Sequence, residues 1–302
     1  MVSTRTDLGN ETLRGELEGL WRAGRLLSQY RDPADILTHS SKQTFPELLK
    51  SYMERMKSNH GEDIGRERLL SFMGRHQPRV AERFGYDPQR DPLATLAALK
   101  ELLVWFREAF PYYYDKCSLC GNEEDNTFLG YVYPTEEERA FKAGRTELYH
   151  CSKCGAVTRF ARFTAVSKVL DTRRGRCGEY SVLFMRFLEA LGFACRWVVD
   201  WADHVWVEAM VGGRWVHLDP CEAAVDEPLL YQSWGKDQTY VLAFTRTEVV
   251  DVTSTYTSDF LTAKGRRQVG EAEMQSLLEE ATKSLRMAAS GSSSETPIDK
   301  PS

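Results

Sequence analysis

The chain has 302 residues, of which 42% are hydrophobic, and a formal net charge of −5 at pH 7. This length is enough to bury a core, in one large domain or two modest ones. The acidic balance gives no reason to expect a nucleic-acid-binding surface. No run of about 18 apolar residues occurs, so no membrane insertion is expected, and the N-terminus lacks the apolar stretch of a secretory signal.

The first hundred residues have the pattern of helices. Apolar residues in the segment 11–30 recur at close to the spacing of one helical face: Leu13, Leu17, Leu20, Trp21, Leu26 and Leu27. A second helix is predicted from Asp91 as the cap and Pro92 as the first helical residue. Its stripe is Leu93, Leu96, Leu99, Leu102, Leu103 and Phe106. Such stripes form core by default, and a partner-binding face is the alternative.

The second half of the chain alternates between helical and strand-like patterns. β-Branched and aromatic residues predict strands at 196–201, 205–211, 215–218, 240–244 and 249–252. A helical pattern returns at 270–288, with Met274, Leu277, Leu278 and Leu285, and a polar tail follows that is expected to be disordered. We divide the chain into a helical region (1–100), a segment with paired cysteines (101–165), a core with most of the predicted strands (166–265), a C-terminal helix (266–288) and the tail (289–302); the following paragraphs predict metal binding for the second segment and catalysis for the third.

Four of the seven cysteines form two matching Cys-x-x-Cys-Gly turns: Cys117 with Cys120, and Cys151 with Cys154. Without an export signal, the cysteines are expected to be reduced, which favours a metal site over disulfides. Four thiolates suit tetrahedral zinc and leave no open position for substrate, so we predict one structural Zn²⁺ ion. Redox dithiols and unpaired core cysteines are the alternatives, and the sequence does not exclude iron.

Cys177 opens a strongly helical stretch and follows three arginines, Arg173, Arg174 and Arg176. The positive end of a helix and a basic flank both favour a thiolate. These features indicate a nucleophile, whereas the alternative is a small buried side chain, the usual fate of a free cysteine.

A hairpin register brings a histidine and an aspartate together. If Gly212-Gly213 is a two-residue turn, paired positions sum to 425, which places Trp206 opposite Asp219. His204 is then a diagonal neighbour of Asp219 on the same sheet face. His217 shares that face, so the register alone does not exclude it, but it lies further from the strand end expected to meet Cys177. A cysteine, a histidine and an aspartate in this arrangement suit acyl chemistry.

Several motifs, in one order, carry a resemblance to a known family. Besides the two cysteine pairs they are Thr158-Arg159-Phe160, Thr172-Arg173-Arg174-Gly175-Arg176-Cys177-Gly178-Glu179, Asp203-His204-Val205-Trp206, Asp219-Pro220-Cys221-Glu222 and Val249-Val250-Asp251-Val252. The segment from about 102 to 256 resembles the cytoplasmic peptide:N-glycanases, a family of the transglutaminase-like superfamily. The resemblance implies an α+β fold with a papain-like, transglutaminase-like core, an antiparallel sheet, a zinc-binding subdomain and flanking helices.

The resemblance also implies roles for single residues. Cys177, His204 and Asp219 match the family's catalytic triad, and the four paired cysteines match its zinc ligands. Glu222 matches a glutamate near the sugar. The family's tryptophan before the first zinc cysteine is missing here, and Tyr112 or Tyr113 is expected to supply a hydroxyl to the oxyanion in its place.

The implied reaction releases the glycan from N-glycosylated, misfolded glycoproteins during ER-associated degradation and converts asparagine to aspartate. The implied partner is a ubiquitin receptor that shuttles substrates to the proteasome and is bound through terminal helices. Independently of the resemblance, the absence of an export signal and the expected reduced cysteines predict a location in the cytoplasm, with the nucleus as a second site. The alternatives are a transglutaminase or cysteine protease of the same superfamily, or a non-catalytic scaffold.

Overall fold

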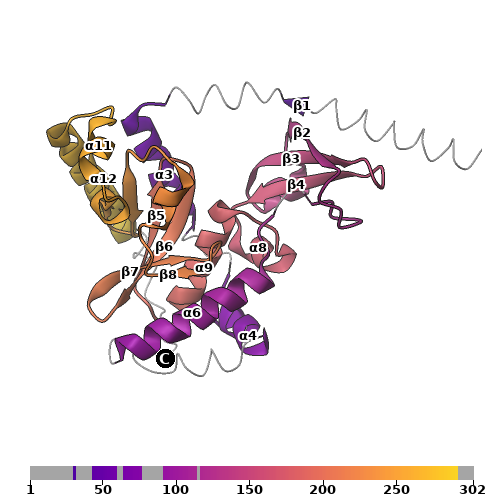
Figure 1. Ribbon diagram of the computed structural model, residues 1–302, viewed down its shortest axis with the longest axis horizontal. Coiled ribbons are helices and arrows are strands. Elements are labelled where there is room, and N and C mark those ends of the chain that lie inside the picture. Colours follow the sequence, from indigo (N-terminus) through magenta and orange to yellow (C-terminus); the bar gives the residue numbers. More distant parts are fainter. Residues whose placement is uncertain (1–29, 32–42, 60–63, 77–90, 114–115, 292–302) are drawn as a thin grey trace, which may run out of the picture. The chain divides into compact units, whose positions relative to one another are not determined.

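A computed structural model describes residues 30–31, 43–59, 64–76, 91–113 and 116–291 (Figure 1). The chain forms two compact units. Of the described residues, the Cys-pair unit contains 30–31, 113 and 116–165, and the triad unit contains 43–59, 64–76, 91–112 and 166–291. The helix predicted within 11–30 lies outside the described residues, except for its last residue, as does the tail from 292 onward. The five-segment division of the sequence stays a prediction.

The Cys-pair unit is built on an antiparallel sheet with the strand order β1-β2-β3-β4. The strands are β1 (Tyr30–Arg31), β2 (Asn126–Val132), β3 (Ala143–Cys151) and β4 (Val157–Phe163). The short helix α7 (Glu136–Ala140) starts with a capping box in which Thr135 and Glu138 bond each other's backbone N–H groups. The Glu138 carboxylate also accepts two hydrogen bonds from Arg159, at 2.9 and 2.7 Å, which holds α7 on β4.

The triad unit contains a six-stranded antiparallel sheet with the order β10-β9-β5-β6-β7-β8. Its strands are β5 (Cys195–Asp200), β6 (His204–Val211), β7 (Arg214–Asp219), β8 (Ala224–Val225), β9 (Val241–Phe244) and β10 (Val249–Asp251). All five strands predicted from residue patterns are present. The α+β fold with an antiparallel sheet is therefore confirmed.

Helix α9 (Cys177–Ala190) lies at the centre of the triad unit. Eleven of its fourteen residues are buried, because it packs on β5 and β6 and also contacts α4 (Arg66–His76) and α8 (Val166–Thr172) (Figure 1). A helix with apolar residues on all sides is expected in the interior of a large core. The thiol that begins this helix is thus carried by the most enclosed helix of the unit.

Helix α6 (Pro92–Ala109) begins where the sequence predicts. The Asp91 carboxylate accepts a hydrogen bond from the backbone N–H of Ala94 at 3.0 Å, and Pro92 occupies the first turn. The later part of the predicted stripe is buried: Leu99, Leu102, Leu103 and Phe106. Leu93, however, is 80% exposed, so its assignment to the core stripe was wrong. It lies in the first turn of the helix, ahead of the buried part.

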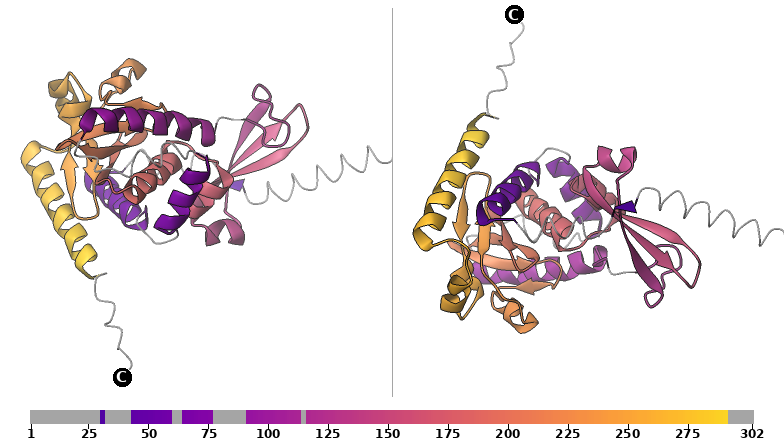
Figure 2. Two further views of the ribbon diagram at one scale, coloured as in Figure 1. Left: turned by 90° about the horizontal axis from the view of Figure 1, so that it is seen from below. Right: turned by 90° about the horizontal axis from the view of Figure 1, so that it is seen from above.

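The C-terminal helices pack on the triad unit. They are α10 (Thr253–Tyr256), α11 (Phe260–Gly265) and α12 (Glu271–Gly291). Helix α12 runs beside α3 (Phe45–Asn59), as both views of Figure 2 show, and its inward stripe is Met274, Leu278, Ala281 and Leu285. Helix α12 extends to residue 291. In the described part of the chain, no helix is long and apolar enough to cross a membrane.

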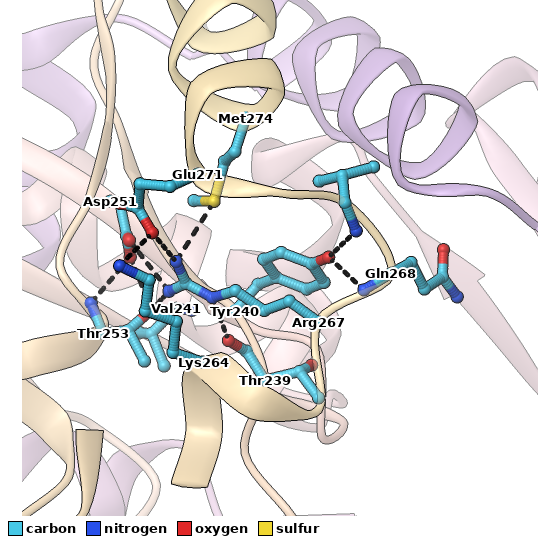
Figure 3. Close-up of polar contacts among 11 residues, drawn as sticks. Thr239, Tyr240, Val241, Asp251, Thr253, Lys264, Arg267, Gln268, Glu271 and Met274 are labelled. Atoms are coloured by element: carbon cyan, nitrogen blue, oxygen red, sulfur yellow. Dashed lines mark hydrogen bonds and ion pairs between the residues drawn. The ribbon is translucent and has the colours of Figure 1, made fainter. Parts of the chain in front are cut away.

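Arg267 joins the C-terminal helices to the sheet (Figure 3). Its side chain is 2% exposed and donates hydrogen bonds to the Asp251 carboxylate at 2.8 Å and to the Thr239 carbonyl at 3.0 Å. Its guanidinium also lies over the Tyr240 ring, 5.2 Å from the centroid. Nearby, the Tyr240 hydroxyl accepts a hydrogen bond from the Gln268 N–H at 2.8 Å. One buried cation therefore connects the segment before α12 to β10 and to the residues before β9.

Replacing Arg267 by alanine should lower the free energy of unfolding by about 3 kcal/mol, because it leaves the Asp251 carboxylate without its buried partner. Chemical denaturation checks the value. The matched control is Arg266→Ala, which breaks an exposed ion pair with Asp237 and should cost under about 1 kcal/mol. Equal effects of the two substitutions would contradict this account.

Candidate active site and metal site

The four paired cysteines converge at one point in the Cys-pair unit. The Sγ atoms of Cys117 and Cys154 are 3.7 Å apart, those of Cys120 and Cys151 are 3.6 Å apart, and all four lie within 4.8 Å of one another. A tetrahedron with Zn–S bonds of about 2.3 Å has S–S separations of about 3.8 Å. The four thiols therefore have the spacing that a tetrahedral metal ion requires.

Both cysteine pairs have the same backbone turn. In the first turn the N–H of Gly121 donates to the carbonyl of Cys117 at 2.9 Å, and in the second Gly155 donates to Cys151 at 2.8 Å. The two glycines have φ angles of +73° and +69°, so the predicted need for positive φ is confirmed. Hydrogen bonds from the backbone of Cys120 and Leu119 contribute to lowering the pKa of the Cys117 thiol to about 6.

If the four cysteines hold a structural metal, serine in place of Cys120 or Cys154 should abolish metal binding and destabilise the protein, because each substitution removes one of four thiolate ligands and structural metal contributes directly to folding. Metal content by elemental analysis and thermal unfolding check this. The control is Cys195→Ser, which changes a thiol outside the cluster. A soluble, metal-free Cys120→Ser protein with unchanged heat resistance would exclude a structural site.

Cys177 is the first residue of α9, as the sequence predicts. The Glu179 carboxylate accepts a hydrogen bond from the Arg176 N–H at 3.0 Å, which closes the helix start. A side chain at Gly175 would collide with the Tyr180 ring, because a Cβ there would lie 2.7 Å from a ring carbon. The Tyr180 hydroxyl in turn lies 2.8 Å from the Pro111 carbonyl and 2.9 Å from that of Arg173. The Tyr180 side chain therefore holds the segments around Pro111 and Arg173 against the start of α9.

The hairpin register follows the prediction. Val211 pairs with Arg214 and Val207 with Leu218, so paired positions sum to 425. This brings Nε2 of His204 to 2.7 Å from Oδ2 of Asp219. The residue before the histidine, Asp203, has a φ of +65°, and its carbonyl accepts a hydrogen bond from the Lys236 ammonium at 3.0 Å. The tight turn before β6 is thus held in an unusual backbone conformation at the start of the strand.

His204 connects the thiol to the carboxylate. Its side chain is 7% exposed, and burial alone would lower its pKa, but hydrogen bonds to Asp219 and Cys177, together with their charges, raise the pKa to about 9. Since Nε2 faces Asp219, the other ring nitrogen, Nδ1, is left for the sulfur. Burial also disfavours the ionised form of Asp219, yet the hydrogen bond from His204 outweighs it and lowers the pKa of Asp219.

Two residues to which the sequence analysis gave no role, Tyr231 and His217, continue the hydrogen-bonded series beyond Asp219. The Tyr231 hydroxyl donates to Oδ2 of Asp219 at 2.8 Å and lies 2.7 Å from Nε2 of His217. The histidine shares a sheet face with Asp219, which the register predicted, but nothing in the sequence placed Tyr231 there. It belongs to the short 3₁₀ helix η1 (Leu230–Trp234), which folds back over the hairpin.

The remaining predicted site residues occupy different places. The Tyr112 hydroxyl hydrogen-bonds Cys177, and burial together with the nearby thiol raises the pKa of Tyr112. Tyr113 instead packs its ring on Phe160, with centroids 3.9 Å apart, in the core of the Cys-pair unit. Glu222 follows Asp219 closely: its N–H donates to Oδ1 of Asp219 at 3.3 Å, and its exposed carboxylate lies 3.7 Å from Arg107.

A thiol, an imidazole and a carboxylate in hydrogen-bonded sequence can perform nucleophilic acyl transfer. The thiolate attacks a carbonyl, the imidazole carries the proton, and the carboxylate keeps the imidazole oriented. A cationic imidazole beside the sulfur stabilises the thiolate before substrate arrives.

His204 should keep its proton up to about pH 9, because the charges of Asp219 and Cys177 outweigh the effect of burial. Proton NMR of the imidazole resonances, assigned with a His204→Gln variant, measures this. Asp219→Asn removes the largest favourable contact and should move the His204 titration to lower pH. The control is Asp226→Asn, which alters an exposed carboxylate paired with Arg214 on the same hairpin. A His204 midpoint near 6.5 in the unchanged protein would contradict the geometry.

Comparison with known proteins identifies a matching protein family. A family model described as the transglutaminase-like superfamily matches residues 128–220, a range that contains all three residues of the predicted triad. Together with the fold and the site, this match shows that residues 128–220 form a transglutaminase-like domain.

Within that superfamily, the chain is a homologue of proteins named peptide-N(4)-(N-acetyl-beta-glucosaminyl)asparagine amidase. The relative from Gallus gallus is 45% identical over 163 residues, which cover 52% of this chain and 25% of the relative. The relative from Eremothecium gossypii is 38% identical over 214 residues, or 69% and 59% of the two chains. The relative from Saccharomyces cerevisiae is 39% identical over 195 residues, or 62% and 53%. The matched region thus spans between a quarter and three fifths of these relatives.

Proposed function

We propose that this protein is a peptide:N-glycanase, an amidohydrolase that cleaves the bond between a glycan and an asparagine side chain. The observation that carries the proposal is the hydrogen-bonded series from Cys177 through His204 to Asp219, inside the region that matches the superfamily. The names of the homologues supply the substrate class, since the triad alone would serve other acyl-transfer reactions equally.

The reaction would proceed in two steps at the side-chain amide. The Cys177 thiolate attacks the amide carbon, and His204 protonates the leaving glycosylamine, which departs and leaves a thioester. Water, deprotonated by His204, then hydrolyses the thioester and regenerates the thiol, so that asparagine has become aspartate. Asp219 holds the imidazole in position throughout.

Two donors are placed for the negative oxygen that forms during the attack. The Tyr112 hydroxyl hydrogen-bonds the Cys177 thiol and therefore lies beside the attacking atom. The second donor is the N–H of Cys177, at the first position of α9, which hydrogen-bonds the Tyr112 oxygen before substrate binds. Preorganised donors of this kind stabilise a developing oxyanion.

An aromatic side chain beside the triad suits a carbohydrate. The Trp234 ring is 40% exposed, and its centroid lies 4.9 Å from that of His204. The Lys236 ammonium lies 5.2 Å from the same ring. An exposed indole next to a proton carrier offers an apolar platform for a sugar ring, and we assign the glycan to this side, with Glu222 as its further contact.

The wider context of the reaction is proposed from the resemblance. We infer one structural Zn²⁺ ion on Cys117, Cys120, Cys151 and Cys154, for which the four-thiol geometry is the support. We also propose misfolded glycoproteins of ER-associated degradation as substrates, action in the cytoplasm and nucleus, and binding of a proteasome-shuttle ubiquitin receptor. For that partner the apolar stripe within 11–30 remains the candidate contact, because the stripe of α12 is packed inside the triad unit.

Cys177→Ala should abolish glycan release from a denatured glycopeptide, because no neighbouring group can replace the thiolate. Mass spectrometry checks it by the conversion of asparagine to aspartate. Cys195→Ala, outside the site, is the control and should keep full activity. Turnover of Cys177→Ala above a few per cent would refute the assignment. If the unchanged protein releases no glycan, incorporation of an amine into glutamine would favour a transglutaminase, and peptide cleavage would favour a protease. Absence of all three activities would favour a scaffold.

A further inference from the structure

The Asp219 carboxylate is completely buried and has more partners than the histidine it faces. Its Oδ1 accepts hydrogen bonds from the N–H groups of Cys221 at 2.8 Å and Glu222 at 3.3 Å. Its Oδ2 accepts from His204 at 2.7 Å and from the Tyr231 hydroxyl at 2.8 Å. We propose that Tyr231, held by His217, is a positioning residue that fixes Asp219 and thereby keeps the His204 imidazole turned toward Cys177. The inference rests on the thiol chemistry of the proposed function.

The hydrogen bonds that join His217, Tyr231 and Asp219 have only one arrangement of donors and acceptors. The N–H of Glu227 donates to Nδ1 of His217 at 3.3 Å, so Nδ1 is an acceptor and the proton of the neutral ring is on Nε2. Nε2 therefore donates to the Tyr231 oxygen, 2.7 Å away. The hydroxyl proton of Tyr231 is then free to point only at Asp219. His217 thus determines the orientation of the tyrosine hydroxyl.

Burial keeps His217 in the neutral form that this direction requires. The side chain is 3% exposed, and burial lowers its pKa to about 4. A second proton on the ring would place an N–H against the donor of Glu227, so the arrangement is stable only when the ring is neutral. The other ionisable groups close to the triad include Asp200, at the end of β5, which interacts with His204, and the buried thiol of Cys221, which interacts with Asp219 and Cys177.

Packing fixes Tyr231 as firmly as its hydrogen bonds do. Its ring stacks on Trp206 with centroids 4.3 Å apart and is fully buried. The residues of the series come from three elements: His204 from β6, His217 and Asp219 from β7, and Tyr231 from η1. Because η1 crosses back to the hairpin, the position of Asp219 depends on a segment outside the two strands that carry His204 and Asp219.

Without the Tyr231 hydroxyl, Oδ2 of Asp219 would keep only the hydrogen bond from His204, while Oδ1 would keep its two backbone donors. The carboxylate could then turn, and the imidazole that it orients would spend less time facing the sulfur. The thiolate of Cys177 would lose part of the stabilisation that the imidazolium provides. The effect should therefore be seen at the thiol itself, before any substrate binds.

The test is the rate at which iodoacetamide alkylates Cys177, measured between pH 5 and pH 10 by mass spectrometry of the peptide that contains it. In Tyr231→Phe the rate at pH 6 should fall by roughly fivefold or more relative to the rate at pH 10, which shifts the profile, because less of the thiolate is paired with the imidazolium. The matched control is Tyr256→Phe, which removes another buried hydroxyl from the same aromatic cluster, one that donates to Glu208 at 2.6 Å. It should leave the profile unchanged.

Two variants of His217 test separately whether its hydrogen bond to Tyr231 is needed. His217→Leu removes the donor and should reproduce the shift of Tyr231→Phe in part or in full. His217→Gln keeps an N–H donor near the same place and should restore the profile. If Tyr231→Phe fails to fold, as judged by near-ultraviolet circular dichroism, the leucine and glutamine pair decides the question.

Three results would overturn the inference: an unchanged profile in Tyr231→Phe, an equal shift in Tyr256→Phe, or an unchanged profile in His217→Leu. Alkylation requires no glycopeptide, so the outcome is independent of the substrate. A protein with a reactive Cys177 and the expected shifts, but no glycan release, would refute the proposed function and leave the positioning role intact.

Discussion

The hydrogen bond between His204 and the buried Asp219 is the interaction on which the site depends. A carboxylate with no exposed surface is costly to bury unless every oxygen lone pair has a donor. Here two donors come from the turn after β7, one from β6 and one from η1. Meeting that demand requires the hairpin register, the turn and the 3₁₀ helix to be in place together, so the geometry of the triad and the local fold are set by the same contacts.

Rigid elements carry each chemical group. The thiol begins the most enclosed helix of its unit, the imidazole begins a central strand, and the carboxylate ends the neighbouring strand. Groups placed on helices and strands hold their positions more closely than groups on loops. The exception is Tyr112, which follows α6 in a connecting segment and is steadied by Tyr180, whose hydroxyl lies near the carbonyl of the preceding proline.

The cluster of four cysteines is arranged mainly by local geometry. Its four thiols are arranged by two short turns that repeat the same hydrogen bonds, so each turn specifies its own geometry locally. The sheet then has only to bring two prepared turns together, which β2 and β3 do by pairing Asn126 with Cys151. A site built this way is readable from the spacing of the cysteines, because little of its geometry depends on distant segments.

The sequence by itself determined whatever depends on neighbours along the chain. The helix start at Cys177, the Asp91 cap, the glycine turns of the metal site and the register of the β6–β7 hairpin are all local, and each was predicted correctly. Tertiary structure decided what depends on segments that meet only in the folded core. It placed Tyr231 on Asp219, separated the two tyrosines so that Tyr112 contacts the thiol while Tyr113 packs on Phe160, and left Leu93 exposed. Residue patterns report the period of an element but not which distant surface covers it, because packing partners are chosen by the whole fold.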